Sequence, residues 1–382
     1  NSFANFNMTF FWIVFVLGFT YLCALFGDVY ASLNPWNAMS LWIERLQPAA
    51  FAGRRAWPVR WSYEPALLLY IGFIWIELFA HSGPPALSTM LLAYTALNLV
   101  GAWYFGRQSW FRYAEFFAVF LRLMAKVAIL EWQRDAAGRG RLRLRRLDSL
   151  LHGDRAEHLS LLLFVLFMLS STAFDGLRES APWMKLYWQD IHGWLKPWVG
   201  DNIVESYAIL KPLYLAWQTF ALLLSPFLYL GIYLLFIALV RHITRSPLGL
   251  RDLALRFAYT LLPIALVYHL THYFTLLIVQ GTQIFRLASD PFGWGWNLFG
   301  TARWLLQPIR IDANIVWHVQ VGLILLGHIV SVALAHLEAL RIFPDRRTAT
   351  LSQLPMLLLM VAFTTFGLWI LSLPISPGQG TL

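Results

Sequence analysis

Eight long apolar runs constrain the fold of this chain more than any other feature of its sequence. Several approach or exceed the roughly 18 residues with which a helix crosses a bilayer. Only 13% of the 382 residues are charged, against about 25% in a soluble domain. We therefore predict an all-α fold: a polytopic transmembrane helical bundle with about eight spans, in a single domain of residues 1–382. The expected spans are residues 10–26, 64–81, 87–104, 159–174, 210–240, 253–280, 315–337 and 354–373.

The arginine-rich loops predict the orientation of this bundle. Lys and Arg gather in the cytoplasmic loops of membrane proteins, so the net charge of +9 is no reason to expect nucleic-acid binding. The loops after Val240 and Leu337 are basic, whereas residues 175–205 and 282–312 carry mixed charge. Both ends of the chain are thus expected on the non-cytoplasmic side. The chain opens at Asn1 rather than at a methionine, and we expect native residues before it.

Residues 111–132 differ from the other apolar segments because polar side chains recur at intervals of seven, four and seven residues. This spacing places them on one stripe of a helix. One alternative is a transmembrane helix with its polar stripe buried. We predict instead an interfacial amphipathic helix along the cytoplasmic face, because the very basic loop that follows would otherwise lie opposite the other basic loops. The stripe consists of Glu115, Arg122, Lys126 and Gln133.

Histidine and glutamate side chains interrupt the apolar runs. Ionisable residues inside a membrane are costly and indicate a functional site. His269 and His272 are three residues apart and share one helical face, and Glu77 and His81 share another at a spacing of four. A rise of 1.5 Å per residue puts these four residues and His318 in one layer of the outer half of the bundle.

Imidazoles and a carboxylate in one layer are ligands that zinc, copper or non-haem iron takes. We predict a divalent metal, zinc or copper, held by His269, His272, Glu77, His81 and His318. Glu77 and His272 are the expected catalytic residues, with Glu77 as a ligand or general base. The alternative for the histidines is a hydrogen-bonded seam between helices.

Haem is a second cofactor hypothesis. His328 lies about 15 Å deeper than His318 by the same helical rise. His269 or His272 could face His318 or His328 across a bis-imidazole iron, with His328 as the cofactor-binding residue. The alternative for His328 is a hydrogen bond within the bundle.

The polar loop at residues 289–301 is rich in Gly and Trp. Its Asp290 and Asn297 are expected either to form part of a lid over the outer layer or to make turns. The chain has no P-loop, no dinucleotide fingerprint, no Gly-x-Ser-x-Gly elbow and no His-Glu-x-x-His motif. Cys23, the only cysteine, excludes an intrachain disulfide and a Cys-rich metal site.

A set of short motifs extends over most of the chain. They include Gly27-Asp28-Val29, Asn34-Pro35-Trp36, Trp75-Ile76-Glu77-Leu78, His269-Leu270-Thr271-His272-Tyr273, Gln280-Gly281-Thr282-Gln283, Ser289-Asp290-Pro291-Phe292-Gly293, Gly295-Trp296-Asn297-Leu298-Phe299-Gly300-Thr301, Gly327-His328, Ala335-His336, Asp345-Arg346-Arg347 and Gln353-Leu354-Pro355-Met356. In these motifs the chain resembles bacterial multi-span membrane proteins described as fenitrothion hydrolase-like. The resemblance implies a multi-pass protein of the bacterial inner membrane that hydrolyses an organophosphate triester with other membrane or periplasmic subunits. It implies no particular catalytic residue.

We therefore expect a membrane-embedded, metal-dependent hydrolase-like protein, or the membrane subunit of such an enzyme, that acts on a hydrophobic ester. The alternative is a non-catalytic membrane subunit of a larger complex, which anchors partners or binds haem or copper for electron transfer. A transporter fits less well, since the chain shows neither internal repeats nor paired broken helices.

Overall fold

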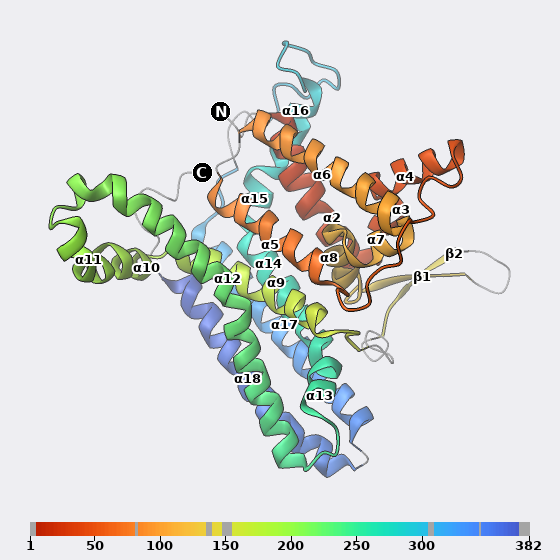
Figure 1. Ribbon diagram of the computed structural model, residues 1–382, viewed down its shortest axis with the longest axis vertical. Helices are drawn as coiled ribbons and strands as arrows, with labels where there is room; N and C mark the ends of the chain where they lie inside the picture. The colour runs from red at the N-terminus through yellow and green to blue at the C-terminus, as the bar shows by residue number, and fades with distance from the viewer. Residues whose placement is uncertain are drawn as a thin grey trace. The chain divides into compact units, whose positions relative to one another are not determined.

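The structure, a computed structural model, describes residues 5–80, 83–134, 140–146, 155–304, 309–343 and 345–373, with the side chains of residues 131–134, 140 and 141 excepted. The described part consists of helices and the loops that join them, together with one antiparallel hairpin in which Leu130 pairs with Leu144 (Figure 1). Its labelled elements are α1 (Phe6–Thr9), α2 (Phe19–Phe26), α3 (Tyr30–Leu33), α4 (Pro35–Leu46), α5 (Glu64–Phe79), α6 (Pro84–Phe105), α7 (Arg107–Tyr113), α8 (Phe116–Ala125), β1 (Leu130–Arg134), β2 (Gly140–Leu144), α9 (Leu159–Arg178), α10 (Ala181–Lys185), α11 (His192–Val199), α12 (Ile203–Thr244), α13 (Leu250–Phe257), α14 (Leu262–His272), α15 (Phe274–Val279), α16 (Ile284–Ser289), α17 (Ala313–Ile342) and α18 (Arg346–Ser372).

Seven helices of the described chain are long and apolar enough to cross a membrane, which confirms the all-α bundle of a multi-pass membrane protein. The other expected span forms α5, whose 16 residues extend about 24 Å, less than the roughly 30 Å of a hydrocarbon core. The seven are Phe6–Phe26, Pro84–Phe105, Leu159–Arg178, Ile203–Thr244, Leu250–His272, Ala313–Ile342 and Arg346–Ser372.

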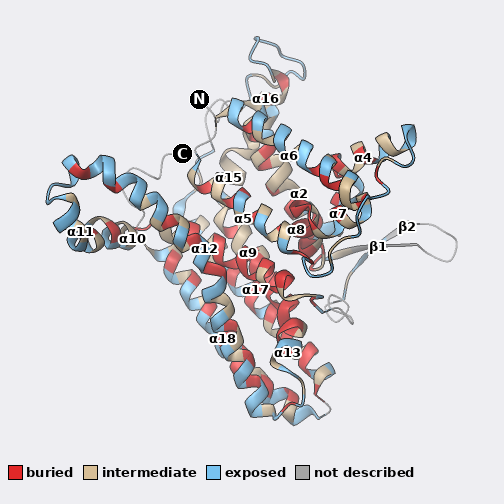
Figure 2. Cartoon of the chain, in the orientation of Figure 1, coloured by how far each residue is buried: buried red, intermediate tan, exposed pale blue. Residues whose placement is uncertain are grey.

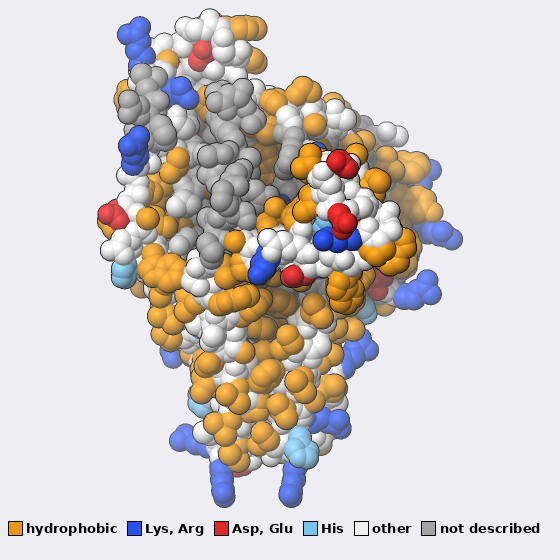
Figure 3. All heavy atoms as spheres, turned by 90° about the vertical axis from the view of Figure 1, so that its left-hand side faces the viewer, with side chains coloured by type: hydrophobic (Ala, Val, Ile, Leu, Met, Phe, Trp, Pro, Cys, Tyr) orange, Lys and Arg blue, Asp and Glu red, His pale blue; other side chains and the backbone are white. Residues whose placement is uncertain are grey.

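Burial differs sharply among these helices. Figure 2 shows α9 largely buried, whereas α12 and α18 carry many exposed residues. Large apolar side chains such as Phe220, Phe227 and Leu358 are more than half exposed. In Figure 3, hydrophobic side chains cover most of the lower part of the visible face, and Lys and Arg side chains lie at its lower end. An apolar band with basic residues at its end is typical of the surface of a membrane protein.

The chain divides into two compact units, which are described separately. Unit 1 consists of Asn1–Tyr70, His81–Leu161 and Tyr273–Leu323, and unit 2 of Ile71–Ala80, Leu162–His272 and Ile324–Leu382. The single domain expected from the sequence stays a prediction.

In unit 1, the segment expected to be one amphipathic helix is two helices and a strand. The break falls at Glu115, whose backbone is extended and whose carboxylate accepts hydrogen bonds from the amides of Phe117 and Ala118 at the start of α8. α8 has only ten residues, about 15 Å, and is therefore too short to cross a bilayer. Eight of the ten are buried, so its apolar side chains form core rather than one lipid-facing stripe. Its position along the cytoplasmic interface stays a prediction.

Glu115 is fully buried beneath this core. Its carboxylate also accepts a hydrogen bond from Asn34 Nδ2 at 3.0 Å and one from the Tyr94 hydroxyl. Burial raises the pKa of Glu115 from 4.5 to about 7, although these hydrogen bonds oppose the rise.

The raised pKa of Glu115 predicts that unit 1 loses stability between pH 4.5 and 7. In this window the unfolded chain releases the proton that the folded chain retains, so the free energy of unfolding falls as pH rises. At about 1.4 kcal/mol per pKa unit the full loss is about 3 kcal/mol. Thermal unfolding in detergent across this pH range measures it. Glu115→Gln should flatten the dependence, whereas Glu64→Gln, at an exposed site, should leave it unchanged. Equal slopes in all three proteins would contradict the assignment.

In unit 2, close helix contacts depend on small residues. A Cβ atom at Gly327 of α17 would lie 2.3 Å from the Val267 side chain of α14. The hydroxyl of Tyr268 lies against Gly367 of α18 and donates a hydrogen bond to the Phe363 carbonyl at 2.7 Å. α14 is thereby packed against both C-terminal helices, and this packing fixes the position of its last turn.

The helix expected over residues 253–280 is interrupted. A 3₁₀ turn at Ala258–Leu261 separates α13 from α14, just before Pro263, and the backbone leaves the helical region at Tyr273. Proline lacks the amide hydrogen of a regular helix, which accounts for the first irregularity. Nothing in the sequence explains the second. The second break places His272 at the end of α14 rather than within a longer helix.

Candidate acid–base site

The centre of the candidate site is a hydrogen-bonded pair of side chains from two helices of unit 2. His272, at the end of α14, donates from Nε2 to Oδ2 of Asp175 in α9, at 2.6 Å. Both side chains are largely buried, with exposed fractions of 22% and 12%. Because the carboxylate accepts the Nε2 proton, Nδ1 is the ring nitrogen that would take a further proton. An imidazole oriented in this way by a carboxylate is the arrangement of a general base.

Arg178 completes the charge balance of the pair. Its Nε donates to Oδ1 of Asp175 at 2.8 Å, so each carboxylate oxygen has its own partner. Its Nη2 lies 3.4 Å from Oε1 of Glu179, and its guanidinium lies 5.7 Å from the ring centroid of Phe79. Burial raises the pKa of Glu179, although Arg178 opposes the rise. A buried charge requires partners of this kind.

Two residues expected from the sequence adjoin the pair. Glu77 of α5 and His269 of α14 are both close enough to His272 to interact with it electrostatically. Glu77 is half-buried, and so is His269. The structure therefore brings Glu77, His269 and His272 to one region of unit 2.

The other two predicted ligands do not belong to unit 2. His318 belongs to unit 1, is exposed, and bonds through Nδ1 to the Asn314 carbonyl at 2.7 Å. His81 lies outside the described residues. No three His, Cys, Asp or Glu side chains of the described chain are grouped to hold a metal ion. The zinc, copper and haem hypotheses stay predictions.

His328, the predicted haem residue, is buried in α17 with an exposed fraction of 5%. Its Nδ1 donates to the Ile324 carbonyl at 2.7 Å, and its ring meets that of Tyr268 edge-on at 6.0 Å between centroids. Nε2 has no hydrogen-bond partner among the described residues. This nitrogen is thus an acceptor, and a buried acceptor of this kind commonly binds an ordered water molecule.

Asp175 and Arg178 were missed by the sequence reasoning, which ended the span at Phe174 and assigned both to a loop. The structure continues α9 to Arg178. The spacing of three residues between an acid and a base was the available signal, since it lets them pair on one helical face.

Asp290 and Asn297 accept hydrogen bonds within their own loop, and the lid stays a prediction. The Asp290 carboxylate accepts hydrogen bonds from the amides of Trp294 and Gly295, both at 2.8 Å, and Asn297 Oδ1 accepts from the Ala302 amide at 3.0 Å. The turn-making alternative is therefore supported for both.

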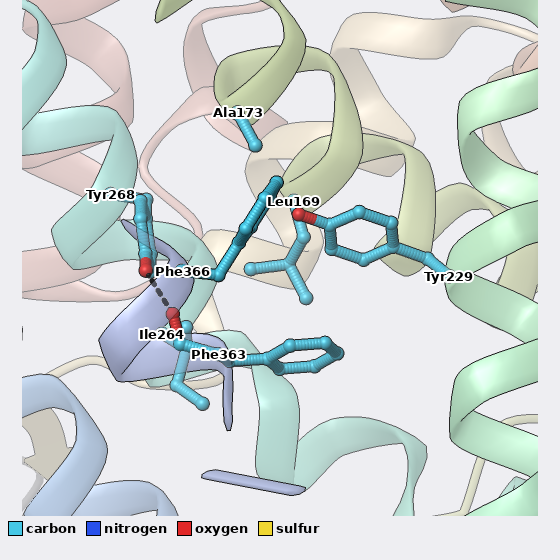
Figure 4. A pocket seen from close by; sticks show the side chains of 7 residues that line it. All are labelled: Leu169, Ala173, Tyr229, Ile264, Tyr268, Phe363 and Phe366. Atoms are coloured by element: carbon cyan, nitrogen blue, oxygen red, sulfur yellow. Dashed lines mark hydrogen bonds between the residues drawn. The ribbon is translucent and has the colours of Figure 1, made fainter. Parts of the chain in front are cut away.

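A small aromatic pocket in unit 2 is lined by residues of α9, α12, α14 and α18 (Figure 4). Ala173 and Tyr268 line it, and they precede Asp175 by two residues and His272 by one helical turn. Its volume of about 10 Å³ has room for about one water molecule. The remaining lining residues are Leu169, Tyr229, Ile264, Phe363 and Phe366.

Comparison with protein-family models, with curated proteins and with solved structures found no match for this chain. The function is therefore argued from the site itself.

Proposed function

We propose that this chain is a membrane-embedded hydrolase, or the membrane subunit of one, in which His272 acts as general base toward water. The observation that carries the proposal is the 2.6 Å bond between His272 and Asp175 inside a bundle of apolar helices. Polar pairs with a purely structural role also occur in membrane proteins, but this one includes an imidazole, the side chain that most often transfers protons in catalysis.

The surroundings favour a hydrophobic ester as substrate, such as an organophosphate triester. The apolar helices around His272 suit such a substrate, and Arg178 holds the Asp175 carboxylate that orients the imidazole. The chemistry agrees with the activity that the sequence resemblance implies. Glu77 would then act electrostatically on His272, as a second acid or as the ligand of a divalent metal.

The same proposal places the chain in the bacterial inner membrane with other membrane or periplasmic subunits. Its support is the multi-pass fold together with the resemblance. A carboxylate on one imidazole nitrogen also commonly orients a histidine that binds a metal through the other nitrogen. Zinc or copper at His272 Nδ1 would supply an activated water, and Asp175 would keep the role of orienting the ring.

The test is hydrolysis of a nitrophenyl organophosphate triester by the purified full chain in lipid nanodiscs, with and without added zinc or copper. Release of nitrophenol is expected from the native chain and from His336→Gln, and not from His272→Gln. His336 is the matched control because it is a helical histidine of the same unit that is not part of the proposed site. Release by His272→Gln at the native rate, or none from the native chain, would show that this chain does not carry the hydrolytic site.

A further inference from the structure

The C-terminal end of α12 carries a second feature, which the acid–base site does not use. A surface hollow of about 640 Å³ lies where the chain turns from α12 into α13. Figure 1 shows this turn at the lower end of α12. This volume is within the range of about 300–1,000 Å³ that is usual for small-molecule sites. Its basic wall is formed by Arg241, His242 and Arg245, and its apolar wall includes Leu235 and Leu239.

The two walls follow one another along one face of α12. Leu235, Leu239, His242 and Arg245 are separated by four, three and three residues, the spacing of one helical face. Leu235 and Leu239 are exposed by 59% and 39%, as side chains that face lipid would be. A rise of 1.5 Å per residue puts Arg245 about 15 Å from Leu235 along the axis. The face thus changes from apolar to basic over about the length of a lipid headgroup and its glycerol.

The basic side chains are not needed to end the helix. Arg245 adopts a left-handed conformation, with φ of 48°, and its amide bonds to the carbonyl of His242 at 3.3 Å. The amide of Ser246 bonds to the carbonyl of Arg241 at 3.2 Å. These two backbone bonds satisfy carbonyls that basic side chains would otherwise cap.

Among the described residues, no Asp or Glu carboxylate lies within 4 Å of the guanidinium groups of Arg241 and Arg245. Two guanidinium groups above an apolar wall match a phosphate that is attached to acyl chains, because Arg binds phosphate through paired hydrogen bonds. The arginine-rich loops place this end of α12 on the predicted cytoplasmic side, where anionic lipids attract basic clusters.

We propose that this hollow is a binding site for an anionic phospholipid, with Arg241, His242 and Arg245 on the headgroup phosphate and Leu235 and Leu239 along the first part of an acyl chain. The site is independent of the proposed hydrolysis. The occupancy of this site would depend on the content of anionic phospholipid in the membrane.

Native mass spectrometry of the full chain tests the site, after purification from detergent that contains equal amounts of phosphatidylglycerol and phosphatidylcholine. The native chain should retain phosphatidylglycerol in preference to phosphatidylcholine. Arg241→Ala/Arg245→Ala should lose that preference, whereas Arg346→Ala/Arg347→Ala should keep it. The control removes the same charge from exposed residues at the start of α18, which also belong to a basic loop.

Three outcomes would overturn the proposal. Equal loss in both double variants would show general attraction to basic loops. Equal retention of both lipids by the native chain would show no recognition of negative charge. Displacement of phosphatidylglycerol by an equal concentration of inorganic phosphate would show a site for free phosphate, to which the apolar wall contributes nothing.

Discussion

Replacing Asp175 by Asn is expected to lower the rate of ester hydrolysis by about 10²–10⁴-fold, the contribution typical of general acid–base catalysis. The asparagine keeps the size of the side chain but presents an amide that can donate to His272 Nε2. The ring would then carry its proton on Nδ1, the nitrogen that is required to accept one. The rate per folded molecule, measured with the triester in nanodiscs, reports the loss.

Asp190→Asn is the matched control for this experiment, because Asp190 is exposed and lies beyond the end of α9. Its rate should equal that of the native chain. The orienting role of Asp175 also predicts that the loss appears in kcat rather than in KM, since the carboxylate acts through His272 and not on the substrate. An unchanged kcat in Asp175→Asn would remove Asp175 from the mechanism and leave the pair a structural one.

Replacing Asp175 by Ala is expected to destabilise the protein by about 3–5 kcal/mol, the cost of leaving a buried charge without its partner. Arg178 would lose the carboxylate oxygen at 2.8 Å and His272 the one at 2.6 Å, in a part of unit 2 that water scarcely reaches. Asp201→Ala removes the partner of Lys196 from a pair whose side chains are exposed by 89% and 47%. That change should cost no more than about 1 kcal/mol.

Thermal unfolding of both variants in the same detergent measures the difference. Arg178→Ala should be destabilised as Asp175→Ala is, and the double variant should be less unstable than the sum of the two, because each removes the same interaction. Additive losses would show that Asp175 and Arg178 act independently, contrary to the geometry.

The apolar runs predicted the fold class because length and hydropathy alone decide whether a helix suits a bilayer. They could not predict the interruptions. Glu115 begins α8 by accepting hydrogen bonds from the amides of Phe117 and Ala118. Asn34 and Tyr94, which are far away in the sequence, donate to the same carboxylate and hold it there. The depth argument brought Glu77, His269 and His272 together because axial rise is regular, but it could not show which partner His272 would bind. Asp175 was not predicted as a partner because it lies near the end of α9, and helix ends predicted from sequence are uncertain by a few residues.

The two partners of Asp175 are synthesised at different times. His272 follows Asp175 by 97 residues, and at about 5–20 residues per second the ribosome needs roughly 5–20 seconds to make that stretch. Arg178 emerges almost together with Asp175 and can neutralise it on the same turn while α9 enters the lipid. The arginine would thus protect the carboxylate during biogenesis and hold it in place until the histidine arrives.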